Sequence, residues 1–198
     1  HHAGRFGGSG LHGVGHRGVE VFHMTPPPID LLQKNDRYTL IARGLVADFL
    51  VAHQWKLATA ESCTGGLIAA CCTDIAGSSD WFDRGFVTYS NAAKTEMLGV
   101  DAALINHHGA VSEEVVRAMA QGALQHSVAQ VAVAVTGVAG PGGGSAAKPV
   151  GTVWMGWATP AGVVAEVQHV AGDRAQVRAA TVLHAFERLV ELLEAPHP

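Results

Sequence analysis

The sequence predicts a single α/β domain with a mixed, mostly parallel sheet, and three observations support this prediction. Hydrophobic residues make up 48% of the 198-residue chain and charged residues 15%, a balance typical of a compact α/β protein. Strand-like apolar segments alternate with segments of helical periodicity along most of the chain. Later in the chain, two strand-like segments are separated only by residues 159–162, which are too few for a crossover helix. We therefore expect these two strands to form an antiparallel hairpin.

The first half of the chain contains two predicted helices and two predicted strands. Residues 38–53 place Ile41, Leu45 and Phe49 at four-residue spacing, which predicts an amphipathic helix that packs on the sheet. Val46 and Leu50 lie beside this apolar row. The next apolar run predicts a buried strand, and the glycines that follow it are expected to open a helix. These elements are the helix over residues 38–53, the strand over 57–60, the helix from 65 to 76 and a second strand over 85–90.

The second half begins with two helices whose ends carry capping residues. A short helix is expected over residues 92–98, with Ser90 or Asn91 as its cap and Gly99 at its end. Ser112 is expected to cap the next helix, because two acidic residues and an apolar stripe follow it. The remaining predicted elements are strands over residues 131–135, 150–159 and 162–170 and a final helix over residues 173–193.

Composition and charge narrow the possible partners. The formal net charge is −4, so the sequence has no overall attraction for phosphate backbones, and we expect no nucleic-acid partner. No apolar run approaches the roughly 20 residues that cross a bilayer, so we expect a soluble protein without a membrane partner. Residues 1–23 are rich in Gly and His without any periodicity, and we interpret them as a leader ahead of a native start at Met24.

Cysteine and histidine patterns indicate neither a disulfide framework nor a metal site. The three cysteines are Cys63, Cys71 and Cys72, an odd number that includes an adjacent pair, which fits a reducing cytoplasm. His107 and His108 are interpreted as loop residues, because adjacent histidines point in different directions and no third ligand has suitable spacing.

The segment after the first predicted strand carries the chemistry of greatest interest. Hydroxyls at Ser62 and Thr64 lie at a strand-to-helix turn, where helix N–H groups point at whatever lies above the turn. The alternative is that one of these hydroxyls only caps the helix. Cys63 is a rival nucleophile, although a small buried apolar role is favoured for it.

Two further segments supply cations and backbone donors. Lys94 falls in the first turn of a predicted helix, where the helix dipole destabilises an ammonium group, unless the residue is simply a solvated lysine. Residues 136–145 form a glycine-rich loop that either presents N–H groups to an anion or is only a flexible connection. The loop is not a Walker A motif, because Lys148 is followed by proline. Arg174 and Arg178, one turn apart, are either solvated or converge on a phosphate or carboxylate.

Four sequence blocks together resemble the CinA C-terminal domain family, the nicotinamide-nucleotide amidohydrolases. The resemblance extends over nearly all of residues 38–193, with the blocks in the expected order. The blocks are AESCTGGL at 60–67, VTYSNAAK at 87–94, TGVAGPGGG at 136–144 followed by KPVGTVW at 148–154, and GDRAQVR at 172–178.

This resemblance implies a fold and an activity. The implied fold is a three-layer α/β/α sandwich around a mixed sheet, and the implied reaction hydrolyses nicotinamide mononucleotide to nicotinate mononucleotide and ammonia. Ser62 would be the nucleophile, Lys94 its base, and Tyr89 a residue that positions or relays the proton. No metal or organic cofactor is implied, and we expect a cytoplasmic homo-oligomer that acts on a pyridine mononucleotide.

Further residues are assigned to substrate by the same resemblance and by anion chemistry. Glu61 is expected either to orient the turn or to pair with Lys94, and pairing would raise the lysine pKa. The alternative function is a non-catalytic nucleotide-binding or sensor module. The expected oxyanion and substrate-binding residues are Thr64, Gly65, Gly66, Thr136, Gly140, Gly142, Gly143 and Arg174.

Overall fold

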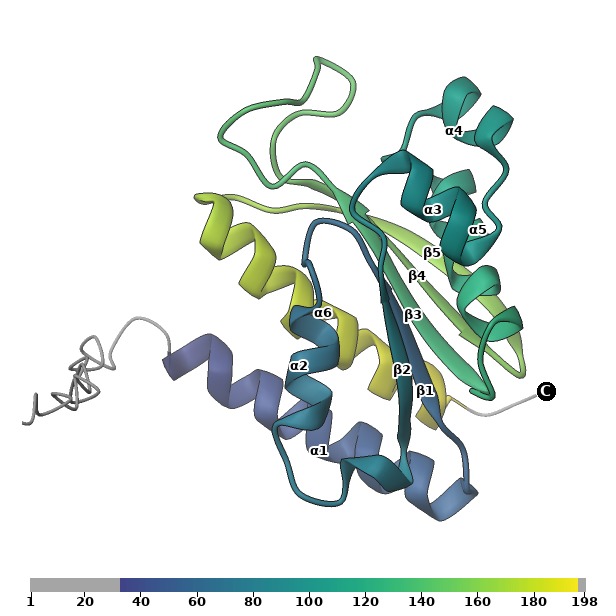
Figure 1. The fold of residues 1–198 in the computed structure, drawn as a ribbon. Helices are drawn as coiled ribbons and strands as arrows, with labels where there is room; N and C mark the ends of the chain where they lie inside the picture. Colours follow the sequence, from purple (N-terminus) through teal and green to yellow (C-terminus); the bar gives the residue numbers. More distant parts are fainter. Residues whose placement is uncertain (1–32, 196–198) are drawn as a thin grey trace, which may run out of the picture.

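The computed structural model describes residues 33–195, and a five-stranded open sheet with the strand order β2-β1-β3-β4-β5 lies at their centre (Figure 1). Strand β1, the neighbour of the central strand β3, pairs in parallel with β2 and β3, whereas β4 is antiparallel to both of its neighbours. The mixed sheet and the β4–β5 hairpin predicted from the sequence are therefore confirmed. The strands are β1 (Leu57–Glu61), β2 (Phe82–Val87), β3 (Val131–Gly137), β4 (Thr152–Thr159) and β5 (Gly162–His169).

Helices cover both faces of this sheet and make it the middle of three layers (Figure 1). One face carries α1, α2 and α6, and the other carries α3, α4 and α5. The helices are α1 (Gln33–His53), α2 (Leu67–Thr73), α3 (Asn91–Leu98), α4 (Ala102–His108), α5 (Glu113–Gln125) and α6 (Arg174–Glu194), with a short 3-10 turn, η1, at Ser78–Asp80. The segment expected to be a leader and the predicted start at Met24 lie outside the described residues.

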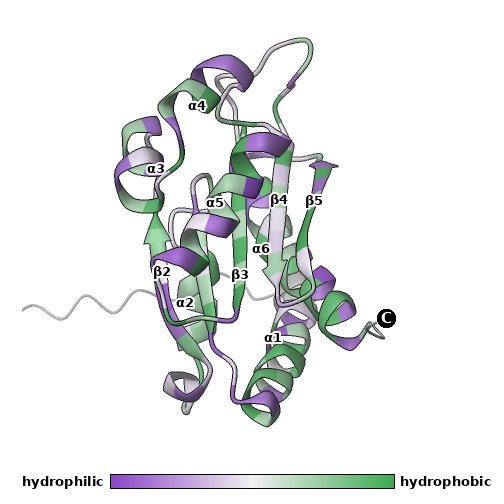
Figure 2. Cartoon of the chain, turned by 90° about the vertical axis from the view of Figure 1, so that its right-hand side faces the viewer, coloured by the Kyte–Doolittle hydropathy of each residue, from purple (hydrophilic) through white to green (hydrophobic). Residues whose placement is uncertain are grey.

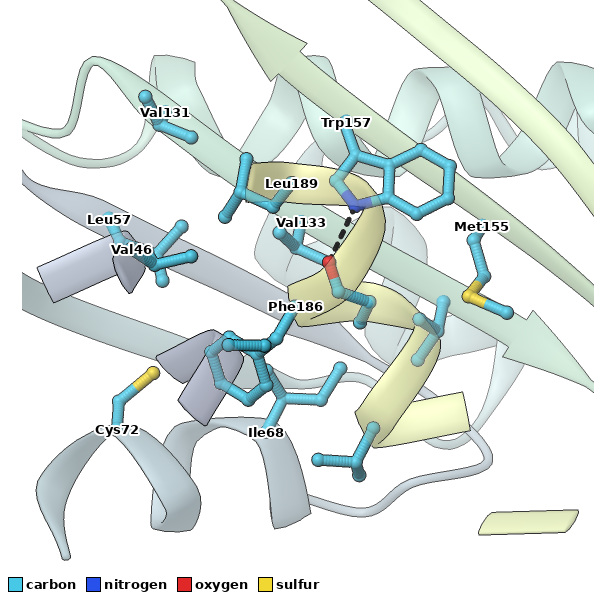
Figure 3. Close-up of a cluster of buried hydrophobic side chains, with 14 of the residues drawn as sticks. Val46, Leu57, Ile68, Cys72, Val131, Val133, Met155, Trp157, Phe186 and Leu189 are labelled. Carbon is cyan, nitrogen blue, oxygen red and sulfur yellow. Dashed lines mark hydrogen bonds between the residues drawn. The ribbon is translucent and has the colours of Figure 1, made fainter. Parts of the chain in front are cut away.

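Alternating side chains of the buried strands supply a core to each helical layer. Figure 2 shows β3 as a predominantly hydrophobic strand, as expected for a strand covered on both faces. On the α6 side, the indole N–H of Trp157 donates to the Ala185 carbonyl at 3.0 Å, so this fully buried side chain is both packed and hydrogen-bonded (Figure 3). The sheet that carries the site is therefore rigidly supported.

The inward face predicted for α1 is correct in part. Val46 and Leu50 are fully buried against α6 and the sheet, and Phe49 is half-buried against the same core. Ile41 and Leu45 are instead 53% and 47% exposed. The buried face is therefore shifted by one position from the row that begins with Ile41 and Leu45, which corresponds to a rotation of about 100° around the helix axis. Figure 2 colours much of the α1 ribbon as hydrophobic, so spacing alone fitted more than one face.

Two further predictions need correction at the ends of elements. His107 and His108 form the last turn of α4 rather than a loop. Asp101 caps the start of this helix by accepting from the Ala103 N–H at 2.9 Å. The strand predicted over residues 85–90 begins at Phe82 and ends at Val87. The chain then leaves the sheet, and the first turn of α3 places Lys94 beside Ser62, which follows the end of β1.

Candidate active site

Three loops meet at the carboxyl edge of the parallel strands and enclose a pocket of about 340 Å³. These loops follow β1, β2 and β3. Strands β2 and β3 lie on opposite sides of β1, so the chain crosses β1 between them. Ligands of open α/β sheets bind at such a point, where neighbouring loops diverge. Of the predicted site residues, those lining the pocket are Ser62, Tyr89, Lys94, Thr136, Gly140, Gly142, Gly143 and Arg174.

Ser62 and Lys94 are in direct contact, although 32 positions separate them in the sequence. The Lys94 ammonium Nζ lies 3.1 Å from Ser62 Oγ, and the two side chains come from the end of β1 and the first turn of α3. Nζ also donates to the carbonyl oxygens of Thr88 at 3.1 Å and Tyr89 at 3.2 Å. The alternative of a solvated surface lysine is wrong, because Lys94 is 1% exposed.

Burial lowers the pKa of Lys94 below the ordinary lysine value of 10.5, because the charged form loses its hydration. The negative charge of Cys63 opposes this shift only where its thiol is ionised. The three atoms that hydrogen-bond to Nζ are uncharged oxygens. This buried site therefore favours the neutral amine more than water does at an exposed lysine.

Glu61 does not serve as the counter-ion of Lys94. Its fully buried carboxylate accepts hydrogen bonds from the Thr64 hydroxyl at 2.7 Å and from the N–H groups of Ile68 at 2.8 Å and Ala69 at 3.0 Å. A fourth bond comes from the Thr59 hydroxyl at 3.1 Å. The carboxylate thus occupies the positive end of α2 and orients the turn that carries Ser62. Of the two alternatives predicted for Glu61, orienting the turn is observed and pairing with Lys94 is not.

The N–H groups predicted as oxyanion donors do not line the pocket. The Gly65 N–H donates to the Ser62 carbonyl at 3.0 Å, and Thr64 is fully buried beneath the turn. Gly66 caps α2 with a φ of 102°, a conformation that favours glycine. The Gly65 N–H therefore closes the turn, and Thr64, Gly65 and Gly66 do not line the pocket.

Arg174 and Arg178 have different partners and do not converge. Arg174 lines the pocket and donates to the Gly140 carbonyl at 3.0 Å. Arg178 instead donates to the carbonyls of Cys63 at 3.1 Å and Thr64 at 3.3 Å, from the side of α6. The first arginine holds the glycine-rich loop, and the second holds the Ser62 turn.

Tyr89 and Cys63 flank the pair. The side chain of Tyr89 is exposed at the pocket, whereas its carbonyl accepts from Lys94 and, at 3.4 Å, from the Ser62 hydroxyl. Cys63 is buried, and desolvation raises the pKa of its thiol to about 11, which keeps it protonated near neutral pH. This environment disfavours Cys63 as the nucleophile.

Some pocket residues were missed by sequence reasoning. Asn91 lies at the start of α3, and Ala110 and Val111 come from the connection between α4 and α5. The Thr136 hydroxyl, 2.9 Å from the Ala110 carbonyl, joins this connection to the glycine-rich loop. Only Asn91 had a signal, because it lies within the matched block VTYSNAAK, between Tyr89 and Lys94.

Within residues 33–195, no cluster of three or more His, Cys, Asp or Glu side chains has an arrangement suited to a metal ion. The three cysteines are free. No helix in the same described part of the chain combines the length and the hydropathy needed to cross a bilayer.

The layered fold and the buried serine–lysine pair define an α/β protein with a polar ligand pocket at its strand ends. The chain belongs to the CinA C-terminal domain family, whose model matches residues 41–193. The resemblance inferred from the four sequence blocks is thereby confirmed.

Curated relatives are similar over most of the chain. The nicotinamide-nucleotide amidohydrolase PncC of Enterobacter agglomerans is 61% identical over 130 residues, which cover 65% of this chain and 79% of the relative. The protein of the same name from Escherichia coli K12 is 51% identical over 145 residues, covering 73% and 88%. A putative competence-damage inducible protein of Symbiobacterium thermophilum is 52% identical, but this chain spans only 35% of it.

Solved structures agree with the observed architecture. The competence/damage inducible protein CihA from Agrobacterium tumefaciens superposes with a TM-score of 0.74 at 48% identity, covering 78% of this chain and 94% of that one. A CinA superfamily protein from Escherichia coli gives a TM-score of 0.76 at 37% identity, covering 79% and 92%. The α/β fold predicted from the sequence is the fold of this family.

Proposed function

We propose that this protein hydrolyses the carboxamide of nicotinamide mononucleotide to nicotinate mononucleotide and ammonia, with Ser62 as nucleophile and Lys94 as its base. The observation that carries the proposal is the 3.1 Å contact between Lys94 Nζ and Ser62 Oγ. The names of the PncC relatives support a nicotinamide nucleotide as the substrate. The burial of Lys94 supports its assignment as the base.

The hydrogen bonds of Lys94 suit a general base. A neutral amine has two N–H bonds and one lone pair. The carbonyls of Thr88 and Tyr89 accept the two N–H bonds, and Ser62 Oγ is the third neighbour of Nζ. The lone pair of the neutral amine is therefore directed at the serine hydroxyl, whose proton it has to accept.

The reaction then follows acyl transfer. Ser62 Oγ attacks the amide carbon as Lys94 Nζ takes the hydroxyl proton, and the tetrahedral intermediate collapses when Nζ returns this proton to the leaving nitrogen. Ammonia departs and an ester remains on Ser62. Lys94 next accepts a proton from water, which attacks the ester, and the acid is released as the proton returns to Ser62 Oγ.

The oxyanion requires backbone donors that reach the pocket. Because the turn donors predicted at Thr64, Gly65 and Gly66 do not line it, we assign the role to the N–H of Cys63, which lines the pocket next to Ser62. The glycines at 140, 142 and 143 and the exposed Arg174 are assigned to the phosphate of the nucleotide. The phenol of Tyr89 is assigned to positioning of the ring or proton relay.

Ammonia release from nicotinamide mononucleotide tests the proposal. Ser62→Ala and Lys94→Met are expected to reduce kcat by at least about 1,000-fold, because nucleophile and base act as a unit. Ser79→Ala and Lys56→Met are matched controls with an exposed serine and a lysine outside the pocket, and they should keep full activity.

The outcomes also separate the amidase from the sensor alternative. A wild-type protein that binds the nucleotide without releasing ammonia, and whose binding is unaffected by Ser62→Ala, would favour a non-catalytic binding module. Ammonia release that survives in Ser62→Ala or Lys94→Met would contradict the assigned mechanism but would still support nicotinamide mononucleotide as the substrate.

A further inference from the structure

The glycine-rich loop between β3 and β4 has little packing of its own. Every residue from 141 to 147 is exposed, yet Gly142, Gly143 and Gly144 line the pocket. A segment with so many glycines gains much conformational entropy when it is released, so its position depends on contacts at its ends. Arg174 provides one such contact, at Gly140.

Lys148 provides a contact at the other end of the loop. Its half-buried side chain crosses to α4, where Nζ donates to the His108 carbonyl at 2.7 Å. This carbonyl belongs to the last residue of α4, whose helix dipole favours a cation there. A Cβ placed on Gly109 would lie only 3.0 Å from Lys148 Nζ, so the glycine that ends α4 also leaves room for the ammonium group.

Both ends of this contact lead directly to the pocket. On the α4 side, Ala110 and Val111 line it two and three positions after His108. On the loop side, Lys148 exchanges backbone and side-chain hydrogen bonds with Ser145: the Ser145 N–H donates to the Lys148 carbonyl at 2.9 Å, and the Lys148 N–H donates to Ser145 Oγ at 3.1 Å. Lys148 itself does not line the pocket.

We propose that Lys148 is a positioning residue that holds the glycine-rich loop against the α4–α5 connection and so sets the separation of two pocket walls. This inference rests on the proposed function for the identity of the ligand. Lys148 makes no contact with the Ser62 and Lys94 pair among the described hydrogen bonds, so its loss should weaken nucleotide binding and leave the chemical step intact.

Lys148→Met tests this role, with Lys148→Arg as the conservative variant and Lys56→Met as the matched control. Lys56 also donates from Nζ to a backbone carbonyl, that of Ser79 at 3.0 Å, but it lies outside the pocket. We expect Lys148→Met to raise KM for nicotinamide mononucleotide about 10-fold with kcat within about twofold of wild type, the size of effect of one charge-assisted hydrogen bond. Lys148→Arg should recover most of the loss, and Lys56→Met should match wild type.

Two readouts do not depend on turnover. Amide hydrogen exchange over residues 142–147 should be faster in Lys148→Met than in wild type or Lys56→Met. In a Ser62→Ala background, the Kd for the mononucleotide measured by calorimetry should rise about 10-fold when Lys148→Met is added.

Unchanged exchange in the loop would overturn the positioning role whatever the enzyme does. Faster exchange with an unchanged Kd would overturn the link to the pocket, and an equal fall in kcat would place Lys148 in the chemical step instead. If wild-type protein releases no ammonia, the proposed function fails, and the exchange and Kd results still decide the role of Lys148.

Discussion

Lys94 is a buried lysine that forms no ion pair with a carboxylate within residues 33–195. Its Nζ contacts two carbonyl oxygens and one hydroxyl, and the nearest acidic residue of the turn, Glu61, is engaged by four donors elsewhere. Burying an unpaired ammonium is costly, and the cost falls when the group is neutral. Burial of Lys94 thus opposes its charged form and makes the neutral amine available to accept a proton.

The activity should depend on pH through Lys94. Burial lowers the pKa of Lys94 below 10.5, and only the deprotonated amine can act as base, so kcat should rise with pH along a limb whose midpoint lies below 10.5. Initial rates of ammonia release, corrected for hydrolysis without enzyme, provide the measurement. Lys94→Arg, which stays charged, should be inactive across the range. A flat profile in wild type would contradict the assignment of Lys94 as base.

Glu61 offers a prediction about stability. Glu61→Gln replaces one acceptor oxygen by an N–H₂ group that faces N–H and O–H donors, so we expect it to lower the free energy of unfolding by about 3 kcal/mol. Urea denaturation measures this change. Glu187→Gln, on the exposed side of α6, should stay within about 0.5 kcal/mol of wild type. A similarly small effect for Glu61→Gln would contradict its role at the start of α2.

The sequence predicted the serine–lysine pair of the site but not the hydrogen bonds of the turn that carries the serine. Ser62 and Lys94 were paired through the family resemblance, and the structure brings them together. The role of Glu61 could not be chosen, because a carboxylate at the end of a strand can accept from the start of the following helix or pair with a lysine from another segment, and spacing along the chain does not distinguish the two. Thr64, Gly65 and Gly66 were assigned from their position at a helix start, but the Gly65 N–H donates to the Ser62 carbonyl and none of the three residues lines the pocket.

At the scale of elements, the helix that carries Lys94 depends on a close approach to α5. A Cβ added to Gly122 would collide with the backbone carbonyl of Leu98, the last residue of α3. A glycine inside a helix ordinarily costs about 1 kcal/mol relative to alanine. Here the missing side chain permits two helices to touch.

Substitution by alanine should therefore have opposite signs in two helices. Gly122→Ala is expected to reduce the free energy of unfolding by about 2 kcal/mol or more, because a backbone carbonyl has to move. Gly44→Ala in α1, where no atom lies within 4 Å of the added Cβ, should increase it by about 0.5–1 kcal/mol. Thermal or urea unfolding of both variants gives the comparison. Stabilisation of both would contradict the close approach.

Local patterns predicted capped helices better than uncapped or broadly apolar ones. Ser112 was identified correctly as a cap, and Ser90 is the observed one of the two candidates, Ser90 and Asn91, since each serine accepts from the N–H three positions on. The face of α1 was predicted only in part, because apolar residues occupy much of that helix. α4 was missed because its seven residues are too few to establish a periodicity.

At the scale of the whole molecule, the order of the strands creates the site. β1 lies between β2 and β3, so the segments after these three strands reach one edge although they are distant in sequence. The sequence alone predicted the mixed sheet and the hairpin, whereas the three-layer arrangement came from the family resemblance. Neither predicted that the α4–α5 connection forms a pocket wall, because Ala110 and Val111 carry no chemical signal. The homo-oligomeric state and the cytoplasmic location remain predictions.

The most direct test of the central claim is to trap the acyl-enzyme. Nicotinamide mononucleotide is mixed with excess wild-type protein, the reaction is quenched in acid within milliseconds to seconds, and the digested protein is examined by mass spectrometry. The account predicts an ester-linked nicotinate mononucleotide on the peptide that contains Ser62, and its absence in Ser62→Ala. Ammonia release with no adduct at any quench time, or an adduct on Cys63, would contradict it.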